Sequence, residues 1–181
     1  WLQTRRLRAP ALAWLRDVAG LTLRPAALER IAPALEAMQS DKRLGHTLRQ
    51  AAEVALSAAA AGQWQPVHVL MHGDLWRGNW MLHGGAGGWS ERLVVIDWAG
   101  SRLDGWPFFD LLRLCDSIGV GGERLGSEIR RHAALAGCAP AHARLCVTAA
   151  LADTLAALEH FPVERFVQMA ERALARLDAA S

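Results

Sequence analysis

The sequence predicts an α+β fold that is mostly helical, with a few short strands in the middle of the chain. Apolar residues at helical spacing run through residues 1–62 and return from residue 107 onward. Between them, residues 67–71, 80–82 and 93–96 are short runs rich in large or β-branched apolar residues, which is typical of strands. A chain of 181 residues with 52% hydrophobic and 21% charged residues can bury one shared core.

The amino-terminal part of the chain carries start and stop signals for helices. Pro25 suits the first position of one helix, and Pro33 is expected to kink that helix. Asp41 is expected to cap the next helix, which Gly62 would end. We therefore expect residues 1–66 to form a helical segment.

The carboxy-terminal part carries the same kinds of signal. Pro107 is expected to open a helix that Gly119 ends, and a second helix is expected over residues 123–136. Pro140 and Pro162 each precede a further helical pattern. The predicted order is helices, a small strand pair, and helices again.

A glycine-rich stretch, residues 83–88, lies between the last two strand-like runs. A phosphate-binding loop would need a strand before it, a helix after it and a lysine, and this stretch has neither the helix nor the lysine. The position between two strands predicts a hairpin loop instead.

Charge and cysteine content exclude several classes of protein. The net charge of +2 lacks the basic surplus of a dedicated nucleic-acid binder. Three cysteines without a C-x-x-C pair do not make a disulfide framework, which favours a reducing, cytoplasmic location. No apolar run reaches the roughly 20 residues that a membrane-spanning helix needs.

The informative motif is H-x-D-x-x-x-x-N at residues 72–79, followed by a β-run that ends in Asp97. Phosphoryl transfer from ATP needs a carboxylate that accepts the proton of the attacking hydroxyl, and oxygen ligands for Mg²⁺ on the phosphates. Asp74 fits the base, while Asn79 and Asp97 fit the metal ligands. An isolated Asp in a turn is usually only a turn residue, but the joint pattern indicates a phosphotransferase site.

His72–Asn79 resembles the "HGDLxxGN" signature of the aminoglycoside phosphotransferases, choline kinases and fructosamine kinases. Ile96-Asp97-Trp98 resembles their metal-binding strand end, and residues 105–111 resemble the "GDPxxDLA" segment that follows it. The resemblance is tight over residues 67–113 and looser over the flanking helices. It implies the carboxy-terminal lobe of a kinase-like fold, in which a short β-hairpin carries the catalytic loop and the metal-binding Asp.

The resemblance also implies roles for single residues. Asp74 would be the general base, and Asn79 and Asp97 would hold Mg²⁺. His72 and Asp110 would support the loop without touching substrate. The implied reaction moves the γ-phosphoryl group of ATP to a hydroxyl of a small molecule, with no nucleic acid or membrane span involved.

Three positions near the motif have open interpretations. Arg77 is a candidate phosphate contact or a surface arginine, and Asp104 is a candidate substrate contact or a turn residue. Trp76 stands where protein kinases have lysine and many relatives have histidine.

We expect residues 1–181 to divide into a helical segment (1–66), a catalytic core (67–113) and a helical subdomain (114–181). The family also has an amino-terminal nucleotide-binding lobe with a sheet and a lysine. Nothing in residues 1–66 predicts that sheet, and the one lysine, Lys42, lies in a helical pattern. We therefore expect that lobe to be absent from this chain, and the chain alone to be inactive.

Two alternatives accompany the leading interpretation. Trp76 matches the "HGDLWSGN" form of fructosamine kinases, so the acceptor is alternatively a sugar-amine adduct or a sugar of the bacterial envelope. A catalytically silent, kinase-like scaffold that binds a partner is the rival outside enzymes. The missing lobe favours the scaffold, and the complete set of Asp74, Asn79 and Asp97 argues against it.

Overall fold

The computed structural model describes residues 2–83, 92–158 and 162–180, which form seven α-helices and five short strands. The helices are α1 (Leu2–Thr22), α2 (Leu28–Ser40), α3 (His46–Ala60), α4 (Phe109–Ser117), α5 (Gly122–Leu135), α6 (His142–Ala156) and α7 (Val163–Asp178). The strands are β1 (Arg24–Pro25), β2 (Val67–Met71), β3 (Trp80–His83), β4 (Arg92–Val95) and β5 (Arg102–Gly105). The mostly helical α+β fold expected from the sequence is confirmed.

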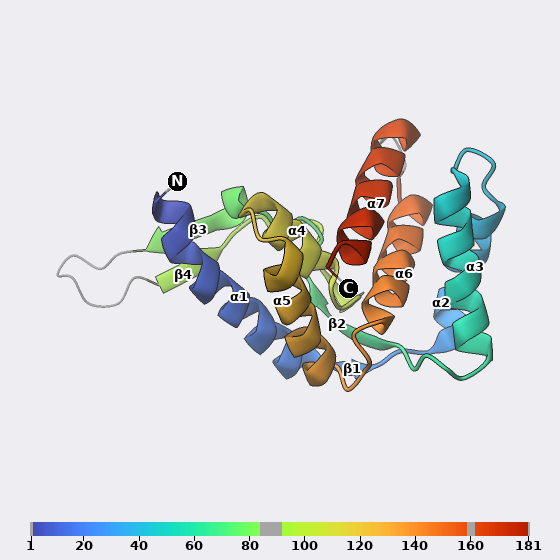
Figure 1. The fold of residues 1–181 in the computed structure, drawn as a ribbon, viewed down its shortest axis with the longest axis horizontal. Coiled ribbons are helices and arrows are strands. Elements are labelled where there is room, and N and C mark those ends of the chain that lie inside the picture. Colours follow the sequence, from blue (N-terminus) through green and yellow to red (C-terminus); the bar gives the residue numbers. More distant parts are fainter. Residues whose placement is uncertain (1, 84–91, 159–161, 181) are drawn as a thin grey trace.

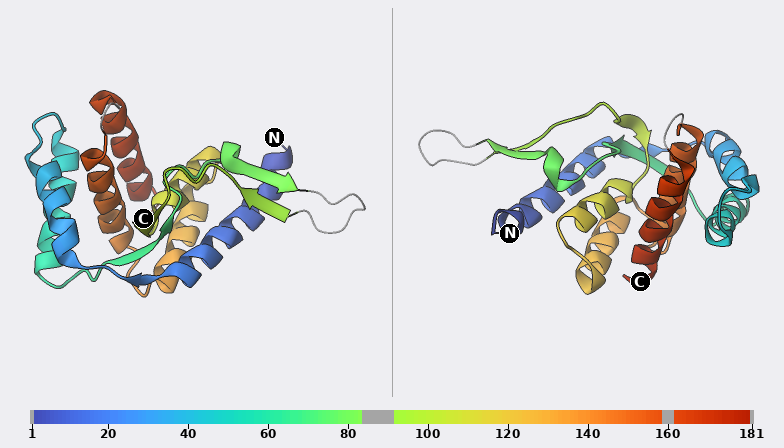
Figure 2. Two further views of the ribbon diagram at one scale, coloured as in Figure 1. Left: turned by 180° about the vertical axis from the view of Figure 1, so that it is seen from behind. Right: turned by 90° about the horizontal axis from the view of Figure 1, so that it is seen from above.

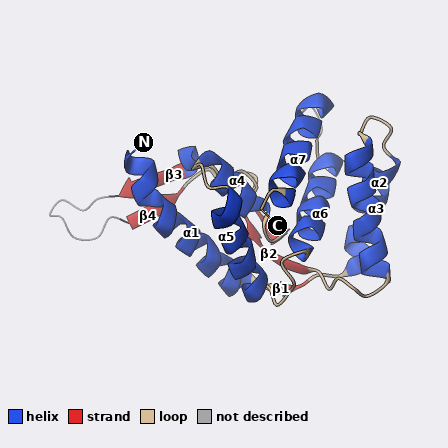
Figure 3. Cartoon of the chain, viewed as in Figure 1, coloured by secondary structure: helices blue, strands red, loops and turns tan. Residues whose placement is uncertain are grey.

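The strands form two small antiparallel sheets (Figure 3). One sheet has the order β1-β2-β5, and the other is the β3-β4 pair. Strands β2 and β5 approach closely at Gly105, where an added Cβ would lie 2.0 Å from the Cβ of Met71, so only glycine fits there. The prediction of a single strand pair was therefore wrong. It missed β1, which has only two residues, and β5, whose sequence Arg-Leu-Asp-Gly has no apolar or β-branched run.

The chain has a β-hairpin at one end and a helical hairpin at the other (Figures 1 and 2). Strands β3 and β4 lie at the first end, close to the start of α1, and α2 with α3 form the second end. Between them, α1 and α5 pack together on one side, and α6 with α7 pack on the other. The 72–79 motif connects β2, between these helix pairs, to β3 at the first end.

Helix α6 is the centre of the core. Every residue from 145 to 152 is buried, so this helix is covered on all of its faces. It packs against α2, α3, α4, α5 and α7. A helix that is apolar all round needs neighbours on every side, which explains why the chain places α6 inside a ring of helices.

Two helix starts differ from the sequence predictions. Pro25 does not open a helix; it pairs with Val67 in the first sheet, and α2 begins at Leu28. Asp41 does not cap α3, whose N-cap is Gly45. Its carboxylate instead accepts hydrogen bonds from Arg43, which lower the pKa of Asp41.

Two of the glycine stop signals are confirmed. Gly62 and Gly119 follow α3 and α4 in the left-handed region that commonly ends helices, each with a φ of 66°. Pro33 lies inside α2, which nevertheless continues to Ser40. The glycine-rich stretch falls outside the described residues from position 84, although the strands on either side of it pair antiparallel. In the described ranges, no helix has the length and apolar character needed to span a membrane.

Candidate active site

The motif loop, residues 72–79, connects the end of β2 to the start of β3. Asp97 follows β4 by two residues. Because β3 and β4 pair with Trp80 opposite Val95, the end of the loop meets the segment that carries Asp97. The Ile96 N–H donates to the Asn79 carbonyl oxygen at 3.0 Å, which extends the pairing by one residue into the motif.

A closed circuit of four hydrogen bonds fixes the loop. The Asp74 N–H donates to His72 Nδ1 at 3.3 Å, and Asn79 Nδ2 donates to the Asp74 carbonyl at 2.9 Å. The Ile96 N–H then donates to the Asn79 carbonyl, and the Ile96 carbonyl lies 2.9 Å from His72 Nε2. The circuit links His72, Asp74 and Asn79 of the motif loop to Ile96, the residue before Asp97.

The surroundings of His72 select one form of its ring. A carbonyl oxygen can only accept, so Nε2 carries the hydrogen toward Ile96, and Nδ1 is then free to accept from the Asp74 N–H. The ring is buried, and the indole of Trp98 covers it with ring centroids 4.8 Å apart. His72 therefore orients the backbone of Asp74 from beneath the loop.

Asp110, in the first turn of α4, holds the start of the loop. Its carboxylate accepts the His72 N–H at 2.6 Å and the Gly73 N–H at 3.0 Å. Burial raises the pKa of Asp110 to about 6, although the two N–H bonds favour the ionised form. The carboxylate is thus largely ionised at neutral pH and satisfies two buried backbone donors at once.

One face of α4 contacts the loop at three successive places. Asp110, Arg113 and Ser117 are spaced i, i+3 and i+7, so they lie along one side of the helix. The Arg113 guanidinium forms a short ion pair with Oδ1 of Asp74. The Ser117 hydroxyl accepts the Arg77 N–H at 2.9 Å. The helix therefore holds the loop along its length.

Asp110 was expected at the loop from the sequence, whereas Arg113 and Ser117 were not. The signal was present, because a helix that places Asp110 against the loop also presents the residues three and seven positions later on the same face. The sequence does not show which atoms of the loop Arg113 and Ser117 contact.

Gly73 is required by the backbone of the loop. Its φ is 82°, in the region that residues with a side chain rarely adopt. An added Cβ would also lie 2.8 Å from the carbonyl oxygen of Gly100. The glycine of the motif therefore permits both the turn and the close passage of the segment after Asp97.

Two non-glycine residues of the described chain have positive φ, and both flank the site. Asp97 has a φ of 62° and Phe108, just before α4, a φ of 71°. Asp tolerates this conformation better than most residues, whereas an aromatic residue there costs about 1–3 kcal/mol. Phe108 is buried, and its packing offsets this strain while it sets the entry of α4 under the loop.

Two side chains at the site, those of Asn79 and Asp97, have oxygen atoms that accept no hydrogen bond in the described residues. Asn79 is buried and uses its amide nitrogen toward Asp74, while in the described residues its Oδ1 has no hydrogen-bond partner. Asp97 is exposed and forms no hydrogen bond or ion pair within the described ranges. No group of three or more His, Cys, Asp or Glu residues that could hold a metal occurs there. A metal at this site would need further oxygen ligands from phosphate or water.

Trp76, Arg77 and Asp104 lie outside the hydrogen-bond circuit of the loop. The Trp76 indole lies over Gly78, where an added Cβ would come within 2.4 Å of the ring. The Arg77 side chain is exposed, without an ion pair in the described residues. Asp104 lies on β5, where burial alone would raise its pKa; the Arg102 hydrogen bond and charge outweigh this, so the pKa of Asp104 is lowered.

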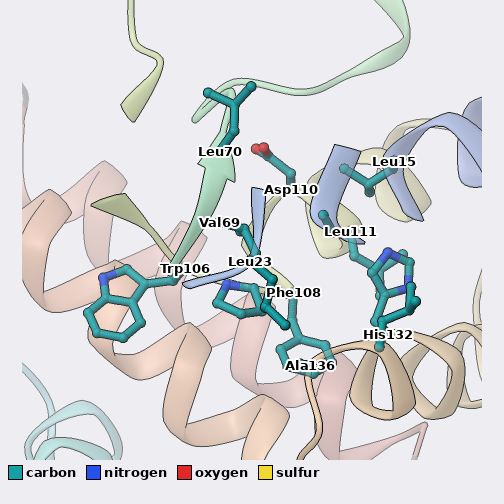
Figure 4. A pocket seen from close by; sticks show the side chains of 13 residues that line it. Leu15, Leu23, Val69, Leu70, Trp106, Phe108, Asp110, Leu111, His132 and Ala136 are labelled. Atoms are coloured by element: carbon teal, nitrogen blue, oxygen red, sulfur yellow. The ribbon is translucent and has the colours of Figure 1, made fainter. Parts of the chain in front are cut away.

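A small hollow among α1, β2, α4 and α5 is a packing space. It encloses about 20 Å³, which is room for about one water molecule, and is lined mainly by apolar side chains. Figure 4 shows the Asp110 carboxylate directed toward the end of β2 near Leu70, with Phe108 and His132 on the far side of the hollow. This hollow has no room for a substrate, whereas the Asp74 side chain is 51% exposed, so the candidate site lies on the solvent side of the loop.

Asp110→Asn tests the buried carboxylate through pH. The pKa of Asp110 is raised from 3.8 to about 6 on folding, so its proton stabilises the native state fully below pH 3.8, and that contribution is lost as pH rises through about 6. The unfolding free energy of the wild type, minus that of the variant, should therefore grow by up to about 3 kcal/mol as pH falls from 7 to 4. Urea unfolding across this range measures it; a constant difference would contradict the assignment.

Comparison with known proteins gives one match. The model of the "Phosphotransferase enzyme family" matches residues 2–147, which include the whole motif loop, Asp97 and helix α4. No curated protein and no solved structure gave a match. The family model covers most of the chain, and its match confirms the resemblance seen in the sequence. The chain therefore belongs to the phosphotransferase enzyme family, whose members include the aminoglycoside phosphotransferase and choline kinase type.

Proposed function

We propose that this protein transfers the γ-phosphoryl group of ATP to a hydroxyl group of a small molecule, with Asp74 as general base. The observation that carries the proposal is the arrangement of the motif loop. One hydrogen-bond circuit joins Asp74, Asn79 and the segment leading to Asp97. Such rigidity suits phosphoryl transfer, in which catalysis is mainly positioning and charge stabilisation.

The chemistry assigned to Asp74 is proton acceptance. As the acceptor oxygen forms its bond to the γ-phosphorus, the bond from that phosphorus to the β-bridging oxygen breaks, and ADP leaves. The hydroxyl proton passes to the Asp74 carboxylate. Its side chain is 51% exposed, so an acceptor can reach it. Arg113 pairs with Oδ1, which leaves Oδ2 available for the proton.

Mg²⁺ would be held by Asn79 Oδ1 and the Asp97 carboxylate. Both are hard oxygen donors without a protein partner in the described residues, which suits this ion. Bound Mg²⁺ would neutralise charge on the ATP phosphates, and those phosphates would complete its coordination. His72 and Asp110 support the loop in this scheme, and Arg113 acts as a positioning residue for Asp74.

The alternatives concern the acceptor and the presence of activity. A fructosamine-kinase-like or envelope-sugar kinase keeps the same loop and changes only the acceptor. A silent scaffold would have no need for the unpartnered oxygens of Asn79 and Asp97, which favours the enzyme. Arg77 remains a candidate phosphate contact because its side chain is exposed; Asp104 is already engaged by Arg102.

Asp74→Asn tests the base. The amide keeps the shape of the side chain but cannot accept the proton, so kcat in the full-length protein should fall by about 10²–10⁴. Asp178→Asn is the matched control, since that carboxylate pairs with Arg144 at the end of α7. ATP consumption with a responsive acceptor measures both. Near-normal turnover of Asp74→Asn would rule out this base.

Asp97→Asn tests the metal site. Asparagine tolerates the left-handed backbone, so the change removes a charge with little strain. Nucleotide affinity in Mg²⁺ should fall by about tenfold, and by less in Asn79→Ala, because a neutral ligand is lost there. Titration of nucleotide with and without Mg²⁺ separates metal effects from folding effects. If Mg²⁺ leaves nucleotide affinity unchanged in the unmutated full-length protein, the metal assignment is wrong.

A further inference from the structure

A cavity of about 360 Å³ is lined by residues of α4, α6 and α7, which are labelled in Figure 1. Its floor is apolar and includes Phe109, Leu112 and Leu151. Its size falls in the range of small-molecule sites. Four arginines line its walls: Arg113, Arg165, Arg172 and Arg176.

The cavity reaches the proposed base through Arg113. This residue lines the cavity, contacts the sulfur of Met169 on α7 at 3.9 Å, and forms the ion pair with Asp74. A molecule in the cavity would therefore lie against the same guanidinium that positions Asp74. Because Arg113 lines the cavity and also pairs with Asp74, an acceptor bound in the cavity would lie near the proposed base.

The charges of the cavity do not balance. Arg172 and Arg176 share the single carboxylate of Asp116, each at 2.9 Å from Oδ1. Arg165 is exposed and has no ion pair in the part of the chain that the structure describes. Of the four arginines, one is neutralised by Asp74 and one by Asp116. The other two have no carboxylate of their own.

The positions on α7 place these cations together. Arg165, Arg172 and Arg176 follow at intervals of seven and four residues, so they lie along one side of the helix. Arg176 is committed to the protein, since it also donates to the Val120 carbonyl at 2.7 Å. The Arg172 side chain is 69% exposed and has donors to spare. Arg165, which has no ion pair in the described residues, and Arg172, which pairs with Asp116 through Nη2 alone, therefore have N–H groups left for a ligand.

We propose that this cavity is the acceptor site and that it selects an anionic hydroxyl compound, such as a sugar that already carries a phosphate or a carboxylate. The proposal rests on the phosphotransferase function proposed above. Arg165 and Arg172 bind the anionic group in the manner typical of arginine with phosphate or carboxylate. The apolar floor packs against the carbon skeleton, and the free hydroxyl points toward Asp74.

Cationic acceptors fit this cavity poorly. An amino sugar or a quaternary amine would meet an excess of positive charge and no unpaired carboxylate in the cavity. The carboxylate of Asp153, elsewhere on α6, is engaged by Trp106 at 2.8 Å and by Arg102 at 3.4 Å. Within the family, this chain is therefore suited to an acceptor of the opposite charge to an aminoglycoside.

The test compares three hexoses that differ in charge. Glucose 6-phosphate, glucose and glucosamine are titrated into the full-length protein by calorimetry, without nucleotide. We expect glucose 6-phosphate to bind at least about tenfold more tightly than glucose, and glucosamine to bind least. The preference should shrink as ionic strength rises. It should persist in Asp74→Asn, because binding does not need the base.

Matched variants locate the site. The double variant Arg165→Gln, Arg172→Gln should remove the preference for glucose 6-phosphate, while Arg131→Gln should keep it. Arg131 lies on α5, pairs with Glu128 and is outside the cavity. Equal binding of glucose 6-phosphate and glucose, or a preference unaffected by the double variant, would overturn the proposed site. That result would leave the proposed function standing, whereas normal turnover in Asp74→Asn would overturn the function and leave the binding result intact.

Discussion

The buried carboxylate of Asp110 is the constraint on which the rest of the site depends. A sharp turn of buried backbone leaves N–H groups that need hydrogen-bond acceptors within the protein. Asp110 accepts two of them, at 2.6 and 3.0 Å, from His72 and Gly73. Burying this charge costs free energy, as its raised pKa indicates, and the two hydrogen bonds offset part of that cost. The start of the motif loop is thereby fixed to the first turn of α4.

Helix α4 joins the proposed chemistry to the proposed acceptor site. One face carries Asp110, Arg113 and Ser117 against the loop, and the adjoining side brings Asp116 to the arginines of α7. The core helix α6 lies beneath both helices and fixes their separation. A single short helix thus sets where Asp74 points and which charge the neighbouring cavity presents.

The sequence predicted the parts that depend on local pattern. The helices, the β3-β4 pair and the motif loop followed from periodicity, glycine positions and residue types. The strands β1 and β5 were not predictable, because β1 has two residues, β5 is polar, and both are defined by their pairing with β2. Asp110 was found through its motif, but the contact of Arg113 with Asp74 and the α4–α7 cavity depend on how helices distant in sequence pack together. Such packing has no local signature.

The central claim is that Asp110 holds the motif loop to α4, and amide hydrogen exchange tests it most directly. In Asp110→Asn, the side-chain oxygen can accept from one N–H while its amide group faces the other. The amides of His72 and Gly73 should therefore exchange at least about tenfold faster in the variant, while the amides of α6 keep their protection. Unchanged exchange at His72 and Gly73, or an equal increase throughout the chain, would contradict it.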